Sequence, residues 1–291
     1  MRQSLVAKIA MMGVAAVATV GLASAGEIKE ERRQFDQREL SVYDPAGSVR
    51  IEAGEGPFIT INVARGGKDA ERIKLKSDFV DDVASLAVVF PGDAVVYPAA
   101  GVASTDVFVN GEGKFGPEIA GRRMTIATQG EGLEAWADMV VRVPAGRHLT
   151  LTLGVGKLVA SNVDGALRLQ TIAGAVEAEG AKGSLWVRGG AASVAVKQAN
   201  AAVDVATESG AIQIVAPAGR KLSAKSATGA VTIALDAKAG AVLDARSEDG
   251  KVTSKLDVPV KDGRRATGKV GDGAAKLNVE TESGEISIIG A

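Results

Sequence analysis

Histidine and cysteine, the residues that most often supply nucleophilic or metal chemistry, are nearly missing from this sequence. It contains one histidine, His148, and no cysteine. Two-histidine metal motifs, thiolate ligands and disulfides are therefore excluded, and any Ser–His–Asp arrangement would depend on this one residue. The internal repeat described below places Lys221 at the position equivalent to His148. Because that position accepts lysine, we expect His148 to lie on the solvated surface without a catalytic role.

Other polar groups have spacings that resemble known sites without completing them. Asp106, Asn110 and Glu112 surround a glycine turn, but their spacing misses the calcium loop pattern and fits the polar tip of a hairpin. Glu177 and Glu179 would share the outward face of a strand, where nothing buries them. The segment GVGKLVA at 154–160 lacks the full phosphate-loop spacing and leads into a strand. We predict a protein that is not an enzyme, with no catalytic residue, no metal site and no cofactor.

Trp186 and Arg188 form the one pair with chemistry suited to binding. If Leu185 and Val187 point into the core, strand alternation points Trp186 and Arg188 outward. Tryptophan and arginine are favoured contact residues at interfaces. Two interpretations remain open at this point. The pair contacts a partner, or the N-terminal region of the chain covers it.

Charge and composition exclude several classes of partner. Of the 291 residues, 34 are basic and 35 are acidic, so the chain lacks the basic excess of a nucleic-acid-binding protein. A polybasic run for membrane surfaces is also missing. Aromatic residues make up only 3%, whereas glycine occurs 36 times. Small and β-branched residues separated by glycines are typical of short strands separated by turns.

The first 25 residues predict a signal peptide. Arg2 and Lys8 precede an apolar run at 9–22, which is too short to span a membrane comfortably. A small-x-small motif ends at Ala25, so we expect cleavage between Ala25 and Gly26. The mature chain would then be exported, to the periplasm or the cell surface, and would keep no stable membrane span.

An internal duplication organises the C-terminal half. TESG occurs at 207–210 and at 281–284, and PAGR occurs at 144–147 and at 217–220. These pairs define two units, about 144–216 and 217–291. Turn positions in the first unit recur every 18 residues, and the second unit continues them less regularly; the series are Gly156, Gly174, Ala192 and Gly210, then Gly229, Gly250, Gly268 and Gly284. We attribute these glycines to positive φ at each turn.

This period predicts an all-β fold in which coils of about 18 residues stack as a β-solenoid, because one coil cannot bury its apolar face alone. One inner column of side chains is expected: Leu167, Leu185, Val203, Leu222, Leu243 and Leu277. The alternative is an antiparallel β-sandwich of hairpins. The solenoid is expected at 144–291, and an irregular β-region at 26–143 would pack on it or cap its open end. Residues 70–137 have no assigned role.

The chain resembles a bacterial putative-adhesin family of β-strand-repeat domains of unknown function. The resemblance covers about 40–290 and is carried by SVRIEAGEGPFITINVARGG, by VVRVPAGRHLTLTLGVGKLVASNVDGALRLQTIAGAVEA and by LNVETESGEISI. These motifs are structural, so the resemblance implies the repeat fold and surface adhesion and brings no functional residues with it.

We therefore expect an exported, non-enzymatic protein of the bacterial envelope that binds an envelope protein or a polysaccharide. Two alternatives stay open, namely a β-helix enzyme acting on polysaccharide and a structural or sensory envelope module. An enzyme predicts a cleft with clustered charged residues from neighbouring coils. A binding module predicts an apolar or aromatic patch near Trp186 without such a cluster, and a structural module predicts evenly spread, paired charges.

Overall fold

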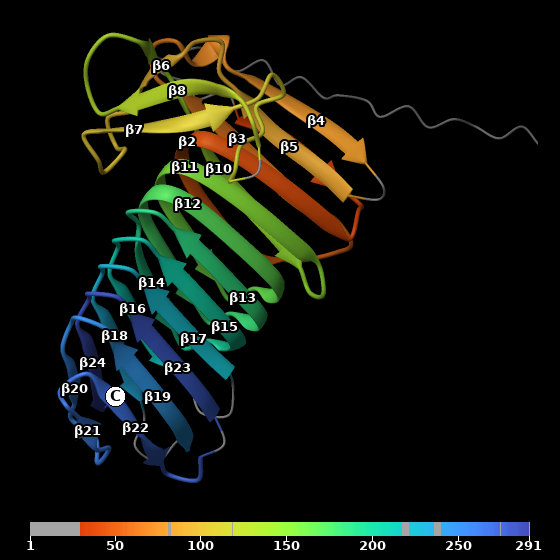
Figure 1. Cartoon of the computed structure of the whole chain (residues 1–291). Helices are drawn as coiled ribbons and strands as arrows, with labels where there is room; N and C mark the ends of the chain where they lie inside the picture. Colours follow the sequence, from red (N-terminus) through yellow and green to blue (C-terminus); the bar gives the residue numbers. More distant parts are fainter. Residues whose placement is uncertain are drawn as a thin grey trace, which may run out of the picture.

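The computed structural model describes residues 30–80, 83–117, 119–216, 221–235, 240–273 and 275–290 as an all-β protein. Its body is a β-solenoid with two walls, wall A and wall B, and each coil passes from wall A to wall B at a corner (Figure 1). Neighbouring coils pair in parallel, which confirms the predicted solenoid and excludes the antiparallel sandwich. The predicted cleavage site, Ala25 and Gly26, lies outside the described residues, as does 217–220.

Three long strands bend through the corner and belong to both walls: β2 (Glu39–Gly54), β11 (His148–Ser161) and β12 (Asp164–Glu179). The other strands of wall A are β4 (Lys74–Val80), β5 (Val83–Val89), β13 (Lys182–Gly189), β15 (Asn200–Thr207), β17 (Lys221–Ser226), β19 (Ala241–Ser247), β21 (Val260–Lys261), β22 (Arg265–Val270) and β23 (Ala275–Thr281). Those of wall B are β1 (Glu30–Phe35), β3 (Ile59–Gly66), β10 (Trp136–Pro144), β14 (Ser193–Lys197), β16 (Ile212–Ala216), β18 (Val231–Leu235), β20 (Val252–Ser254) and β24 (Ile286–Gly290).

The predicted inner column exists, but its order differs at the C-terminal end. All six side chains are at most 5% exposed and stack in register across wall A. However, Leu277 pairs with both Leu222 and Leu243, so β23 lies between β17 and β19. On wall B, β24 lies between β18 and β20 in the same way. The last coil in sequence is therefore the second to last in space.

The irregular segment before this coil covers the end of the stack. Strands β21 and β22 form a hairpin, and β22 pairs antiparallel with β19. Gly268 lies inside β22 opposite Leu243, so it is not the turn glycine that the periodicity predicted. The prediction was wrong because Gly268 falls at the 18-residue spacing although its strand does not form part of a coil.

At the N-terminal end of the stack, too, the order of the coils in space differs from their order in the sequence. The parallel ladder extends upstream of residue 144, since β2 pairs with β11 from Glu39 to Glu52. Outside β2 lies a further coil formed by β5 on wall A and β10 on wall B. The antiparallel strands β4, β3 and β1 continue the two walls beyond it. Residues 70–137, which had no assigned role, thus contribute to the outermost coil.

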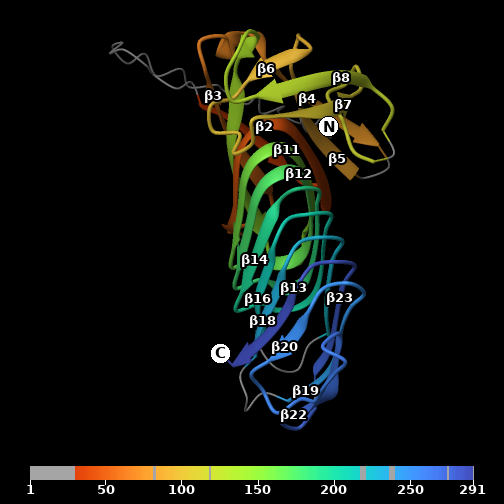
Figure 2. The same ribbon diagram turned by 60° about the vertical axis from the view of Figure 1, so that its left-hand side comes forward.

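Between β5 and β10 the chain leaves the stack at the corner and builds a small sheet. This sheet has the order β7-β8-β6-β9, with β6 (Ala94–Val96), β7 (Ser104–Val109), β8 (Arg122–Ala127) and β9 (Leu133–Glu134). It lies beside the N-terminal end of the solenoid, far from the blue C-terminal coils (Figures 1 and 2). A short 3-10 helix, η1 (Ala70–Arg72), follows β3.

The predicted turn glycines line the corner in successive coils, where a Cβ on any of the six would overlap a carbonyl oxygen of the adjacent coil. Gly156 and Gly174 have φ of 135° and 118°, as expected for glycine turns. Gly210, Gly229, Gly250 and Gly284 have no positive φ of this kind, but a Cβ at any of them would overlap a carbonyl oxygen of the adjacent coil. Close approach between coils, rather than backbone conformation, thus requires glycine at these four corners.

The residue three positions before each corner glycine explains why TESG recurs. Thr207 Oγ1 donates to the Gly210 carbonyl oxygen at 2.7 Å, and Thr281 Oγ1 donates to that of Gly284 at 2.7 Å. Ser226 Oγ accepts from the Gly229 N–H at 2.9 Å. These hydroxyls are buried, so they satisfy backbone groups that water cannot reach. The corner motif is therefore a hydroxyl residue followed by glycine three positions later.

Candidate functional site

Trp186 lies on the outer face of wall A, as strand alternation predicts. Leu185 and Val187 are buried, whereas Trp186 is half-buried on the opposite side of β13. The guanidinium of Arg168 lies 4.7 Å from the indole centroid and that of Arg188 lies 4.1 Å from it. Each arrangement is a cation–π contact of about 0.5–2 kcal/mol. Both guanidinium groups therefore lie over the indole ring and restrict its movement.

The charge of Arg188 is compensated on the next coil. Arg188 Nη1 donates to Asp204 Oδ1 at 2.7 Å, between adjacent strands β13 and β15. Further along wall A, Lys225 pairs with Glu280 at 2.6 Å and Arg265 pairs with Asp244 at 2.9 Å. These three ion pairs thus connect neighbouring strands of wall A.

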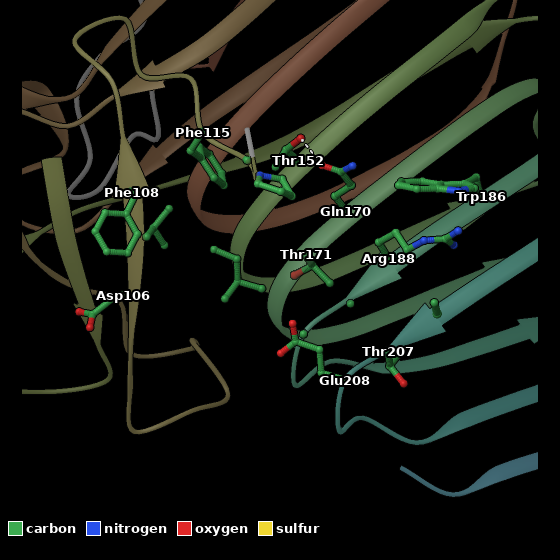
Figure 3. A pocket seen from close by; sticks show the side chains of 17 residues that line it. Asp106, Phe108, Phe115, Thr152, Gln170, Thr171, Trp186, Arg188, Thr207 and Glu208 are labelled. Carbon is green, nitrogen blue, oxygen red and sulfur yellow. Dashed lines mark hydrogen bonds between the residues drawn. The ribbon is translucent and has the colours of Figure 1, made fainter. Parts of the chain in front are cut away.

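A groove of about 640 Å³ separates this face from the small sheet (Figure 3). Its floor is the outer face of β11, β12, β13 and β15 with their corners, and its wall is β7 with the following loop. The residues that line it are Asp106, Val107, Phe108, Phe115, Gly116 and Pro117 from the wall, and Thr152, Gln170, Thr171, Ile172, Trp186, Arg188, Gly189, Gly190, Ala206, Thr207 and Glu208 from the floor. Most of the lining is apolar.

The wall of the groove is fixed to the outermost coils. Phe115 is buried with its ring 6.2 Å from that of Tyr43, at an angle of 63°, which is an edge-to-face contact. Behind it, Lys114 Nζ lies 3.2 Å from Asp78 Oδ2 and 3.3 Å from Glu112 Oε2. Phe108, by contrast, is 55% exposed. The loop is anchored, and an aromatic ring remains available at the mouth of the groove.

Asn110 and Glu112, two of the three residues compared with a calcium loop, make hydrogen bonds and ion pairs at the hairpin tip. Asn110 Oδ1 accepts the N–H groups of Glu112 and Lys114 at 2.9 and 3.0 Å, which closes the hairpin tip. Hydrogen bonds from Lys76 and Lys114 lower the pKa of Glu112. Within the described ranges, no cluster of three or more His, Cys, Asp or Glu residues could hold a metal ion.

Asp106 enters the groove as an ionised carboxylate. Its hydrogen bond with Arg123, followed by that from Thr125, lowers the pKa of Asp106. The Thr125 hydroxyl donates to Asp106 Oδ1 at 2.7 Å, and Arg123 Nη2 lies 2.6 Å from Asp106 Oδ2. A carboxyl with a lowered pKa is a poor proton donor at neutral pH.

A buried acidic cluster beneath the small sheet was missed by the sequence analysis. Asp44 is fully buried in the corner of β2, where its Oδ1 accepts the Ala46 N–H at 3.3 Å. Its Oδ2 has no hydrogen-bond partner among the residues that the structure describes. Burial raises the pKa of Asp44 well above its usual range, the Ala46 hydrogen bond opposes this, and the charge of Asp138 adds to it.

Neighbouring aromatic residues join this cluster to the small sheet. Trp136 Nε1 donates to Asp138 Oδ2 at 3.2 Å, and its ring lies 5.6 Å from that of Tyr97, which follows β6. Burial, and then the charges of Asp138 and Asp44, raises the pKa of Tyr97 to about 12. Asp44-Pro-Ala-Gly47 has the same spacing as the TESG corners, and this signal could have identified the corner from the sequence.

The outer face of wall B carries a different ladder of residues. In spatial order it reads Glu177, Ala195, Gln213, Thr232, Ser287 and Thr253. Glu177 pairs with Lys157 at 2.8 Å. Several of these side chains are small, and Glu179, two residues after Glu177, is exposed and lines a shallow hollow on this face together with Glu177. His148 starts β11 at the edge of wall A and is only half-buried, away from the groove.

None of the described segments forms a helix long and apolar enough to cross a membrane.

Among curated proteins, none matches the chain. A family model described as Toastrack DUF4097 matches residues 22–289. Two solved structures are similar at low identity. A putative cell adhesion protein from Clostridium sporogenes is 13% identical, with 91% of this chain and 100% of that chain covered and a TM-score of 0.38. A putative adhesin from Bacteroides fragilis is 10% identical, with coverage of 90% and 97% and a TM-score of 0.32.

Proposed function

The chain belongs to the Toastrack DUF4097 family, and on that basis we propose that it is an exported, non-enzymatic protein of the bacterial envelope. Its solenoid would act as a rigid support for one binding site, the groove beside Trp186. The ligand would be an envelope protein or a cell-surface polymer. Surface adhesion, which the family resemblance implies, is the corresponding biological role.

The groove is the observation that carries this proposal. Ligand sites are usually preformed concave surfaces lined mainly by apolar side chains with a few polar groups. Here Phe108 and Ile172 provide apolar surface from opposite sides, and Gln170 and Arg188 provide hydrogen-bonding groups on the floor. An apolar groove beside Trp186 supports a binding module, and the N-terminal half of the chain forms the second wall of that groove.

Charge pairing favours binding over catalysis in this groove. Arg188 is paired with Asp204, and Asp106 is paired with Arg123, so these charges are already neutralised. Glycoside hydrolysis requires one carboxyl that stays protonated and a second that is ionised. The pKa of Asp106 is shifted downward, the wrong direction for the proton donor. The enzyme alternative thus lacks support from the carboxyl that the groove wall presents.

Binding is tested by the fluorescence of Trp186, measured in a Trp136→Phe background because the chain has two tryptophans, during titration with soluble envelope glycans and with purified envelope proteins. We expect the wild type to respond, and Phe108→Ser to weaken the response because it removes the exposed ring at the mouth. Phe58→Ser is the matched control, since Phe58 is 43% exposed and lies outside the groove. Equal responses of both variants, or no response to any ligand, would reject the groove as a binding site.

Export is tested separately. N-terminal sequencing of the protein recovered from cell fractions should give a chain that starts at Gly26, as the motif ending at Ala25 predicts. Recovery of the intact N-terminus from the cytoplasm would refute the proposed localisation.

A further inference from the structure

The strand that forms the groove wall has an open edge. Among the strands that the structure describes, β7 pairs with β8 alone, apart from one bridge between Val109 and Phe115. On β8, the Thr125 N–H donates to the Asp93 oxygen and the Ala127 oxygen accepts the Tyr97 N–H, both at 2.8 Å. These two residues of β8 therefore turn their backbone groups toward β6, and the alternate residues Met124 and Ile126 turn theirs toward β7.

This alternation identifies which backbone groups of β7 are left over. The Thr128 N–H donates to the Ala103 oxygen at 3.1 Å, so in the register of the two strands Thr105 and Val107 also pair with β8. The backbone groups of Ser104 and Asp106 then point to the opposite edge, where no strand of the described chain pairs with β7. An exposed edge of this kind is a template for an added strand.

The floor opposite this edge is shallow where an added strand needs room. Gly189, Gly190 and Ala206 expose little or no side chain there, between the larger Ile172 on one side and Glu208 on the other. A Cβ added at Gly190 would overlap the Ile172 carbonyl oxygen, which favours glycine at that turn. The groove therefore keeps an open space beside a row of unpaired backbone groups.

The remaining charge in the groove is negative. Arg188 and Asp106 are each neutralised by a partner. Glu208 is exposed, and no ion pair to it occurs within the described part of the chain. A ligand that lies along the floor would meet this carboxylate at the corner of β15, which favours a basic group on the ligand.

We propose that the groove binds an extended peptide segment of a partner protein, which adds to β7 as a strand. Its backbone would pair with Ser104 and Asp106, its apolar side chains would pack on Phe108 and Ile172, and a lysine or arginine would reach Glu208. This inference rests on the proposed binding function and narrows its ligand. A glycan fits less well because the guanidinium groups of Arg168 and Arg188 both lie over the indole of Trp186, where a sugar ring would have to stack.

The test selects a displayed library of short random peptides on the full mature protein and measures the affinity of the enriched peptides. We expect apolar residues at alternate positions together with a lysine or arginine. Ala206→Gln fills the floor and should weaken binding about tenfold or more. Ala202→Gln is the matched control, because Ala202 is exposed on the same face of β15 and lies outside the groove.

A second pair of variants examines strand addition itself. Asp106→Pro removes the N–H offered at the open edge, whereas Asp106→Asn removes only the charge. Loss of one backbone hydrogen bond should reduce affinity about tenfold, equivalent to about 1.4 kcal/mol, in the proline variant alone. Circular dichroism checks that the proline variant folds, and Ala206→Gln decides the outcome if it does not.

The possible results distinguish the peptide inference from the broader proposal that the groove is a binding site. Enrichment that survives Ala206→Gln, or no enrichment at all, overturns the peptide inference. If soluble peptidoglycan fragments bind the wild type and lose affinity in Ala206→Gln while peptides do not bind, the proposed function stands and the ligand class is wrong. If neither probe binds, both proposals fail.

Discussion

Replacing Asp44 by threonine should stabilise the protein at neutral pH. In every corner with the TESG pattern, a buried hydroxyl bonds a backbone group of the corner, as Thr207 does with Gly210. Asp44 occupies the same position in β2, but its Oδ2 is buried without a partner. A threonine hydroxyl would supply the donor of the other corners and remove a carboxyl that burial disfavours in its charged form.

The sign of the pH dependence follows from the raised pKa of Asp44. The unfolded chain releases this proton near the usual value of about 3.9, whereas the folded chain retains it to higher pH. Stability is therefore greatest below the unfolded pKa and falls as pH rises toward the folded pKa. Asp138 and Tyr97 are the titratable groups that act on this site, and a charged Asp138 disfavours ionisation of Asp44 further.

The magnitude is that of one buried, unsatisfied polar group, about 1–3 kcal/mol. Urea unfolding of the wild type, Asp44→Thr and Asp44→Asn between about pH 4 and pH 8 measures it. Both variants should gain stability relative to the wild type as pH rises, with little difference at the acidic end. Asp36→Asn, at an exposed carboxyl, is the control. A pH-independent difference, or a less stable Asp44→Thr at pH 8, would refute the reasoning.

Three further predictions follow from the corners and the buried cluster. Gly210→Ala should destabilise by about 1–3 kcal/mol in urea, because its Cβ would overlap the Ala192 carbonyl, whereas Gly111→Ala, with open space around it, should be near neutral. Thr207→Val should lose about 1–2 kcal/mol by the same assay, since two buried hydrogen bonds disappear, while Thr232→Val on the outer face of wall B should change little. One of the two tyrosines should ionise only near pH 12 in an ultraviolet titration, and Tyr97→Phe should remove that step.

The sequence was sufficient to predict which side chains face inward. Leu167, Leu185 and Val203 follow a strict 18-residue period, and each is buried in the column expected. The same reasoning placed Trp186 outward. Period-two alternation carries this information because a shift by one residue would move every apolar side chain to the solvent face.

Coil order could not be predicted from the same signal. Leu243 and Leu277 are equivalent members of one inner column, so the periodicity is satisfied whichever of them follows Leu222. The order is set by which strand pairs with the antiparallel hairpin, and that strand is β19.

The groove could not be predicted either, because it depends on how distant segments of the chain fold together. In the sequence, Phe108 belongs to a strand whose apolar residues resemble those of a core strand. In the structure, residues 90–135 leave the stack, and this brings Phe108 into the same groove as Trp186.

At both ends of wall A, an antiparallel strand covers the outermost parallel strand. A parallel stack ends in an unpaired strand that could recruit another chain. At one end β5 is covered by β4, which is antiparallel and carries Lys74 and Lys76, and at the other end β19 is covered by β22, which is antiparallel and carries Arg265 and Lys269. Antiparallel pairing interrupts the 18-residue coil, and the basic side chains disfavour addition of a further strand. β7 belongs to the small sheet and not to either end of wall A. Its open edge lies beside an apolar groove, where pairing with another chain would serve binding.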